Sequence, residues 1–188
     1  MPATRPEKSL VLLLTALLTI LVTAGGTYAL YTSQQKQAAW VTHTLRIESR
    51  LSTLQSQMQA AESAQRGYLL TQEPDFLVPY TDVRNQWLGG IASLRHDVRD
   101  NPAQAQDMDA LAIMIVRYLD QMQDGIDRQR TGRRIDNVQI ARGYKQMALI
   151  VAQIARMKQR EEALLQTRSG DAARLSTMVS GGMALTAR

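Results

Sequence analysis

The chain has 188 residues, a formal net charge of +5 and no cysteine. That length accommodates one folded domain with an appendage. A single Phe, two Trp and five Pro argue against a sheet protein and favour an all-α fold. Without cysteine there is neither a disulfide nor a thiolate metal site. A basic membrane flank or solvated helix faces explain the positive charge as well as nucleic acid does, so we predict no nucleic-acid partner.

An uncharged apolar segment runs from Ser9 to Leu30. As a helix its 22 residues would span about 33 Å, which matches the hydrocarbon core of a bilayer. We predict a transmembrane helix over residues 9–30, in contact with membrane lipid. Arg5 and Lys8 precede it, so the positive-inside tendency keeps residues 1–8 in the cytoplasm. A cleaved signal peptide is the alternative, although signal cores usually have only about 7 to 15 residues.

Apolar residues then recur at alternating steps of four and three, which is the seam of a helix that packs in a bundle. The first seam comprises Thr44, Ile47, Leu51, Leu54, Met58, Ala61, Gln65 and Tyr68. A second helix is predicted over residues 82–99, with one face formed by Val83, Trp87, Ile91, Leu94 and Val98.

Asn101 and Pro102 form a typical cap and first-turn pair, which predicts the start of a third helix that ends near Gly132. Its buried face comprises Met108, Leu111, Ile115, Tyr118 or Leu119, Met122 and Ile126. A fourth helix is predicted to begin after Gly143, with a seam of Met147, Ile150, Ile154, Met157, Glu161, Leu164 and Arg168. Short connections between antiparallel helices predict an up-down-up-down four-helix bundle over residues 31–174.

A second uncharged, mostly small or apolar segment follows Arg174. Its helix from Leu175 to Ala187 would reach only about 20 Å, less than a bilayer core. We therefore expect residues 175–188 to be the start of a truncated second transmembrane helix. On this reading the chain is the N-terminal sensor part of a longer protein.

Two motifs occupy the predicted ends of the first and fourth helices. The first is Gln65, Arg66, Gly67, Tyr68 and Leu69, and the second, Glu-x-x-Leu-Leu-x-x-Arg, is formed by Glu161, Leu164, Leu165 and Arg168. With these motifs, residues 35–174 resemble the CHASE type-3 family of extracytoplasmic sensor domains of histidine kinases, cyclases and chemoreceptors. In that family the first run closes the first helix and the second run closes the fourth.

The resemblance implies a sensor domain of a bacterial receptor in the inner membrane, with the main domain outside the cytoplasm. It implies a homodimer that responds to an unknown ligand or protein and relays the stimulus through the first and last helices to a cytoplasmic output domain. The rival interpretation is a membrane-tethered helical interaction or dimerisation module without a small-molecule ligand.

The first motif contains a glycine, which costs a helix interior about 1 kcal/mol relative to alanine. Gly67 is therefore predicted to let another helix or side chain approach the backbone closely. Glu62 stands four residues before Arg66, the orientation that supports a helix through an ion pair.

Two polar residues, Gln65 and Glu161, lie on otherwise apolar seams, where a polar group needs a hydrogen-bond partner. They either fix the register of the helices, as seam polar residues do in coiled coils, or take part in signalling or ligand binding. At the level of Leu45 on the first helix, Arg46 and Arg50 are the nearby bases. We expect Glu161 to pair with one of them.

Other candidate sites have weaker support. The arginines of the predicted distal turn, Arg128, Arg130, Arg133 and Arg134, indicate either a solvated turn or an anion contact. His96 begins a sequence like a kinase phosphoacceptor box, but its proline falls one place late. His43 is far from His96 in sequence, so we predict no metal site. With no paired carboxylates or nucleophile with a base, we predict no catalytic site, no cofactor and no enzyme activity in this chain.

Overall fold

The computed structural model describes the backbone of residues 6–133 and 136–186, and the side chains of residues 9–133 and 136–170. Its elements in chain order are α1 (Pro6–Thr71), the short 3-10 helix η1 (Pro74–Leu77), α2 (Val78–Asp97), α3 (Pro102–Arg130) and α4 (Asn137–Thr186). The described residues form no strand, so the predicted all-α fold is confirmed. The chain divides into a bundle unit, Thr44–Ala163, and a terminal unit that joins Met1–His43 to Leu164–Arg188.

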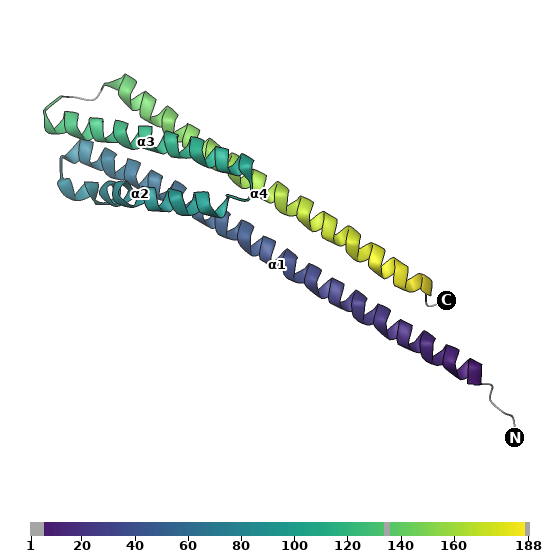
Figure 1. The fold of residues 1–188 in the computed structure, drawn as a ribbon. Coiled ribbons are helices and arrows are strands. Elements are labelled where there is room, and N and C mark those ends of the chain that lie inside the picture. Colours follow the sequence, from purple (N-terminus) through teal and green to yellow (C-terminus); the bar gives the residue numbers. More distant parts are fainter. Residues whose placement is uncertain (1–5, 134–135, 187–188) are drawn as a thin grey trace. The chain divides into compact units, whose positions relative to one another are not determined.

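Within the bundle unit, two hydrogen bonds establish how α1 and α3 run relative to each other. Gln65 Nε2 of α1 donates to the Met122 carbonyl of α3 at 2.7 Å, and Gln129 Nε2 of α3 donates to the Leu69 carbonyl at 3.2 Å. Later residues of α1 thus meet later residues of α3, and these two helices run parallel. Figure 1 shows α2 and α4 running in the opposite direction beside them. The predicted up-down-up-down order is confirmed.

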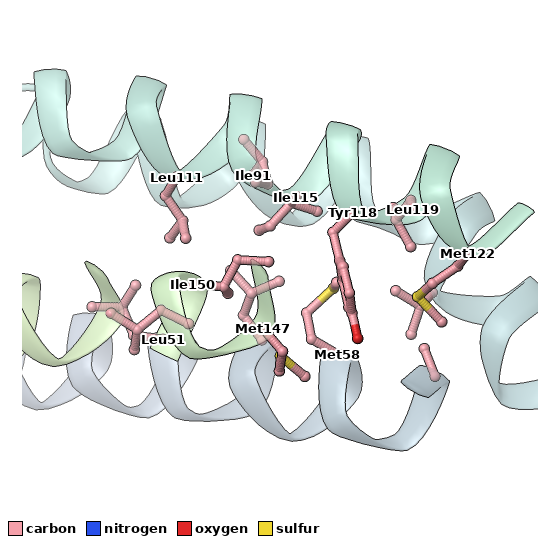
Figure 2. Packing of buried hydrophobic residues seen from close by; sticks show 14 of the residues in the cluster. Leu51, Met58, Ile91, Leu111, Ile115, Tyr118, Leu119, Met122, Met147 and Ile150 are labelled. Atoms are coloured by element: carbon pink, nitrogen blue, oxygen red, sulfur yellow. The ribbon is translucent and has the colours of Figure 1, made fainter. Parts of the chain in front are cut away.

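The core of the bundle unit draws on all four helices, as Figure 2 shows. Every residue of the predicted α1 seam is buried except Gln65, which is half-buried. On α3 both Tyr118 and Leu119 are buried, so the two alternatives for that position are both part of the core. Trp87 of α2 packs partly buried against it. Each fully buried apolar side chain contributes roughly 1.5 to 3 kcal/mol to the hydrophobic term.

Two helices begin earlier than predicted. α2 begins at Val78, not at residue 82, because Pro79 suits the first turn, where no intrahelical amide bond is needed. α4 begins at Asn137, and Gly143 lies inside it. Asp136 explains this start: its Oδ1 accepts from Gln139 N at 2.7 Å, while Asp136 N donates to Gln139 Oε1 at 3.2 Å. This reciprocal pair has the geometry of a capping box.

The ends of α3 form as the sequence predicts. The side chain of Asn101 accepts from the amides of Ala103 and Gln104 at the start of the helix. At the other end Gly132 has φ +72°, and Arg133 N donates to the Arg128 carbonyl at 2.9 Å. These are the features of a Schellman motif, in which a left-handed residue favours glycine.

The first motif closes α1, which ends at Thr71 with Gln72 in a left-handed conformation, φ 62°. The expectation that the second motif closes α4 is wrong, because α4 continues through Arg168 to Thr186. No proline follows the motif, and the next residues include alanine and leucine, which are strong helix formers.

The N-terminal part of α1 is long and apolar enough to cross a membrane, by length and composition. Its most apolar window has a mean hydropathy of 2.2, and only 6% of that window is buried within the structure. The flanking Arg5 lies outside the described residues, and the side chain of Lys8 lies outside the described side chains. In the predicted second membrane segment, residues 175–188, the backbone is helical to Thr186 and the side chains are likewise outside the described ones.

Candidate functional site

The first motif lies at the end of α1 and contacts α3 on one side. The amide of Gln65 donates to the Met122 carbonyl of α3, so this seam polar group has the partner that its position requires. Arg66 forms an ion pair with Glu62 one turn earlier, as predicted. The Arg66 side chain is 63% exposed, so the pair contributes little to stability.

On another side of the same motif, Gly67 faces the ring of Phe76 in η1. A Cβ atom at position 67 would lie 2.5 Å from Phe76 Cδ1. The close approach predicted for Gly67 is thus made by a side chain of the 3-10 helix, an element that the sequence did not reveal. Tyr68 is buried in the core, and Leu69 packs partly buried against it. The glycine is therefore a packing requirement of the α1–η1 contact.

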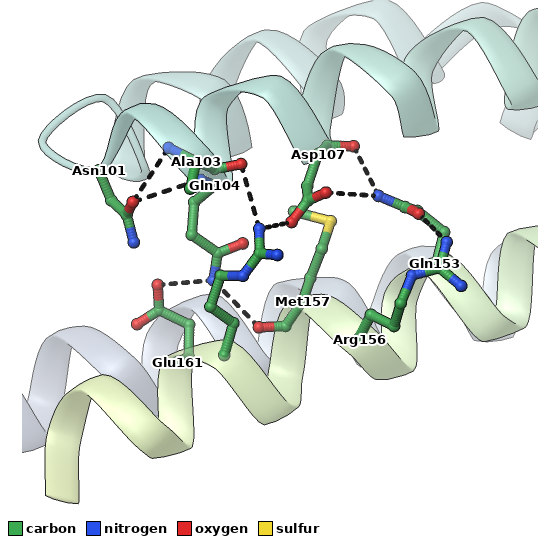
Figure 3. Close-up of polar contacts among 9 residues, drawn as sticks. Asn101, Ala103, Gln104, Asp107, Gln153, Arg156, Met157 and Glu161 are labelled. Atoms are coloured by element: carbon green, nitrogen blue, oxygen red, sulfur yellow. Dashed lines mark hydrogen bonds and ion pairs between the residues drawn. The ribbon is translucent and has the colours of Figure 1, made fainter.

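Glu161 of the second motif lies in a buried polar layer at the opposite end of the bundle unit. Its side chain is only 3% exposed. Glu161 Oε1 accepts from Gln104 Nε2 of α3 at 3.0 Å, and Oε2 accepts from Thr44 Oγ1 of α1 at 3.4 Å. Gln104 Nε2 also donates to the Met157 carbonyl at 3.0 Å (Figure 3). The layer thus joins α1, α3 and α4 at one level.

The predicted pairing of Glu161 with Arg46 or Arg50 is wrong. Arg50 binds Asp97 and Ser93 of α2, and Arg46 is exposed. Successive helical residues are separated by about 100°, so Arg46 lies about 200° around α1 from Thr44, the residue that does meet Glu161. The sequence predicted how far along α1 the partner of Glu161 lies, but it did not predict the face of α1 on which that partner lies.

Charged groups on the surface flank this layer. Arg160 of α4 pairs with Asp107 of α3. Gln153 Nε2 donates to the Asp107 carbonyl at 3.1 Å, as Figure 3 shows. Asp107 is therefore held by two residues of α4. These bonds fix the register of α3 against α4 next to the buried layer.

The remaining residues of the second motif belong to the terminal unit. Leu164 and Leu165 are half-buried. The guanidinium carbon of Arg168 lies 3.6 Å from the centre of the Trp40 ring, a cation–π contact. His43 meets the same ring edge-on, with ring centres 5.9 Å apart. Arg168 thus joins α4 to α1 within the terminal unit.

A family model for the CHASE3 domain matches residues 37–171, which include both motifs, the buried polar layer and the whole bundle unit. The chain belongs to the CHASE3 domain family. CHASE3 is a family of extracellular sensor domains of signalling receptors, and the CHASE3 domain itself is not catalytic. A comparison with curated proteins and one with solved structures each returned no significant match.

Two of the arginines near the turn after α3, Arg128 and Arg130, form ion pairs within α3. Arg128 Nε lies 2.8 Å from Asp124 Oδ2, and Arg130 Nη1 lies 3.4 Å from Asp127 Oδ1. The backbone of Arg133 takes part in the Schellman motif, and Arg134 lies outside the described residues. The anion contact of these arginines stays a prediction.

The two histidines of the CHASE3 domain are not brought together. His43 contacts Trp40, whereas the side chain of His96 is 65% exposed and touches Arg99. Among the described residues there is no group of three or more His, Asp or Glu side chains placed to hold a metal ion.

Sequence reasoning missed a cavity of about 520 Å³ between α1, α3 and α4 of the CHASE3 domain. Glu62, Gln65, Arg66 and Leu69 supply its α1 wall, so the first motif lines the cavity. Tyr118 of α3 also lines it, and burial, with a smaller effect of the Glu62 carboxylate, raises the pKa of this phenol. The only available signal was the group of polar residues Glu62, Gln65 and Arg66 near the end of α1.

Proposed function

We propose that this CHASE3 domain is the extracytoplasmic sensor of a bacterial receptor, anchored in the inner membrane by residues 9–30 with residues 1–8 in the cytoplasm. Residues 31–174 would then lie outside the cytoplasm, and a cytoplasmic output domain of the receptor would receive the signal. The observation that carries the proposal is the CHASE3 match over residues 37–171, preceded by an apolar helix long enough to cross a bilayer.

The relay proposed for this receptor uses α1 and α4. Both helices extend from the bundle unit into the terminal unit without a break. The buried Glu161–Gln104–Thr44 layer and the hydrogen bond from Lys158 Nζ to Ser52 Oγ, 2.7 Å, bond α4 to its neighbours. Packed helices have discrete arrangements, so a stimulus that alters these contacts would shift α4 against α1 by a small slide, tilt or rotation.

A topology experiment tests the anchor. Alkaline phosphatase, which is active only outside the cytoplasm, is fused after Gly132 in the turn between α3 and α4. A second fusion places the enzyme after Lys8. We expect phosphatase activity from the Gly132 fusion alone, because the basic N-terminal flank stays in the cytoplasm.

The two fusions control for each other's expression, and a fluorescent protein that matures only in the cytoplasm should show the reverse pattern. Activity of the phosphatase at Lys8 and not at Gly132 would refute the proposed orientation. Release of the Gly132 fusion from washed membranes as a shortened chain would replace the anchor with a cleaved signal peptide.

A further inference from the structure

The cavity of the bundle unit has the size and lining of a small-molecule site. Its volume of about 520 Å³ falls within the range of roughly 300 to 1,000 Å³ that is usual for ligand pockets. Leu69, Met122 and Ile140 supply apolar surface from three different helices. Gly125 and Gly143, in the interiors of α3 and α4, also line it. Residues without side chains keep this space open at a cost in helix stability.

Gln121 of α3 has a side-chain oxygen that accepts no hydrogen bond from the described residues. Its Oε1 is buried and has no hydrogen-bond partner among the described residues. Its Nε2 makes only a long bond, 3.4 Å, to the Gln139 carbonyl. The terminal amide torsion has a broad energy profile, so the amide can turn. An N–H or O–H group bound in the cavity would supply the missing donor and recover the cost of an unsatisfied buried acceptor.

Among the charged side chains that line the cavity, one is in no ion pair with a described residue. Glu62 is paired with Arg66, and Asp124 is paired with Arg128. Arg142 of α4 also lines the cavity; its side chain is exposed, and no carboxylate of the described residues is paired with it. A guanidinium group binds a carboxylate through two parallel hydrogen bonds. The unpaired guanidinium of Arg142 therefore favours an acidic ligand.

We propose that the cavity binds a small organic acid that carries an apolar body and an N–H or O–H donor. The carboxylate binds Arg142, the donor binds Gln121 Oε1, and the apolar body lies against Met122 and its neighbours. This inference rests on the proposed sensing function and names the ligand class of the sensor. Binding between α1, α3 and α4 alters the contacts through which α4 is held.

The test is calorimetric titration of the full chain in detergent with 4-hydroxyphenylacetate, indole-3-acetate and L-tyrosine. Phenylacetate lacks the donor and 4-hydroxyphenylacetamide lacks the carboxylate, so these two compounds are matched controls. We expect at least one of the three acids to bind at one site per chain, and both controls to bind more weakly or not at all.

Variants locate the binding. We expect Arg142→Gln to weaken binding at least about tenfold, because hydrogen bonds between charged groups are strong. Gln121→Met, which keeps the size of the side chain and removes the acceptor, should weaken it about fivefold, as expected for one neutral hydrogen bond. Lys145→Gln removes an exposed cation of α4 that does not line the cavity, and should leave the affinity unchanged.

If none of the three acids gives binding heat in the titration or raises the melting temperature of the chain, the proposal is overturned. Equal affinity for 4-hydroxyphenylacetate and its amide would also overturn it. Unchanged affinity in Arg142→Gln would also overturn it. Circular dichroism of each variant verifies that the bundle is folded. The titration does not depend on membrane orientation, so a failed titration with correct fusion activities refutes the ligand class and leaves the sensor topology standing.

Discussion

At the scale of single residues, Glu161 is the group with the most restrictive environment. A carboxyl group enclosed in a helix bundle needs donors, and it has them in Gln104 and Thr44. Gln104 is itself fully buried, and its Oε1 has no partner among the described residues. The neutral side chains of Gln104 and Thr44 thus supply the donors to Glu161 that the sequence analysis expected from an arginine.

We predict that Glu161→Ala lowers the free energy of unfolding by roughly 1 to 3 kcal/mol, because it leaves the Thr44 hydroxyl and one of the two N–H groups of Gln104 Nε2 buried without an acceptor. Glu161→Gln keeps one acceptor and nearly the same volume, so its effect should be less than about 1 kcal/mol. Glu162→Ala, a change at the exposed neighbour on α4, is the control. Urea denaturation of the full chain in detergent, followed by circular dichroism, measures all three.

Equal losses of unfolding free energy in Glu161→Ala and Glu162→Ala would mean that the hydrogen bonds of the layer do not stabilise the fold.

The polar residues of the seams also show a limit of prediction from sequence. The seam identified Gln65 and Glu161 as polar groups that need partners, but two of those partners, Met122 and Gln104, come from α3. Which residue of another helix faces a given position depends on the rotation of that helix about its axis, and this was not available from the spacing within α1 and α4.

At the scale of elements, two helix-interior glycines have opposite surroundings. Gly67 meets the Phe76 ring, whereas a Cβ atom at Gly143 would make an ordinary contact of 3.4 Å with Gln121 Nε2. We predict that Gly143→Ala raises the free energy of unfolding by up to about 1 kcal/mol through helix propensity. Gly67→Ala should lower it by about 1 kcal/mol, because displacement of the ring outweighs the same gain.

The measurement is again denaturant unfolding, and the double variant Gly67→Ala with Phe76→Ala supplies the control. Without the ring the alanine at position 67 should be stabilising relative to Phe76→Ala alone. A stabilising effect of Gly67→Ala in the presence of Phe76 would show that the ring leaves its place freely.

Element boundaries were predictable where local chemistry specified them. Asn101–Pro102 and Gly132 delimited α3 correctly, because a cap and a left-handed terminus act within a few residues. Gly143 predicts a later start for α4, but the helix begins at Asn137, because Asp136 and Gln139 have the spacing of a capping box. η1 had no periodic signal, because an element of four residues is too short to show one.

At the scale of the whole molecule, the core lies within the bundle unit. Its buried apolar residues run from Ile47 to Met157, while the apolar side chains from Leu10 to Val22 are exposed. We predict that a fragment of residues 35–174 is soluble, helical and cooperatively folded. The fragment retains all the buried core residues, which run from Ile47 to Met157. Thermal unfolding followed by circular dichroism, compared with the full chain in detergent, measures this.

A fragment without a cooperative transition would show that the bundle depends on the segments removed. The homodimer stays a prediction, and light scattering of the same fragment over a range of concentrations gives its mass.

The family and the helical order were accessible from the sequence, because motifs and seams are local patterns along the chain. The cavity was not, since it arises where three helices leave space between them.

The continuity of α1 and α4 restricts how this domain can change length in evolution. A residue inserted into an unbroken helix turns everything beyond it by about 100° and advances it by about 1.5 Å. The buried seam on one side of the insertion would then lose its alignment with the segment on the other side. Residues 98–101 and 131–136 lie between helices and carry no such constraint. Related domains should therefore vary in length at these two connections, and change α1 or α4 mainly by steps near whole turns.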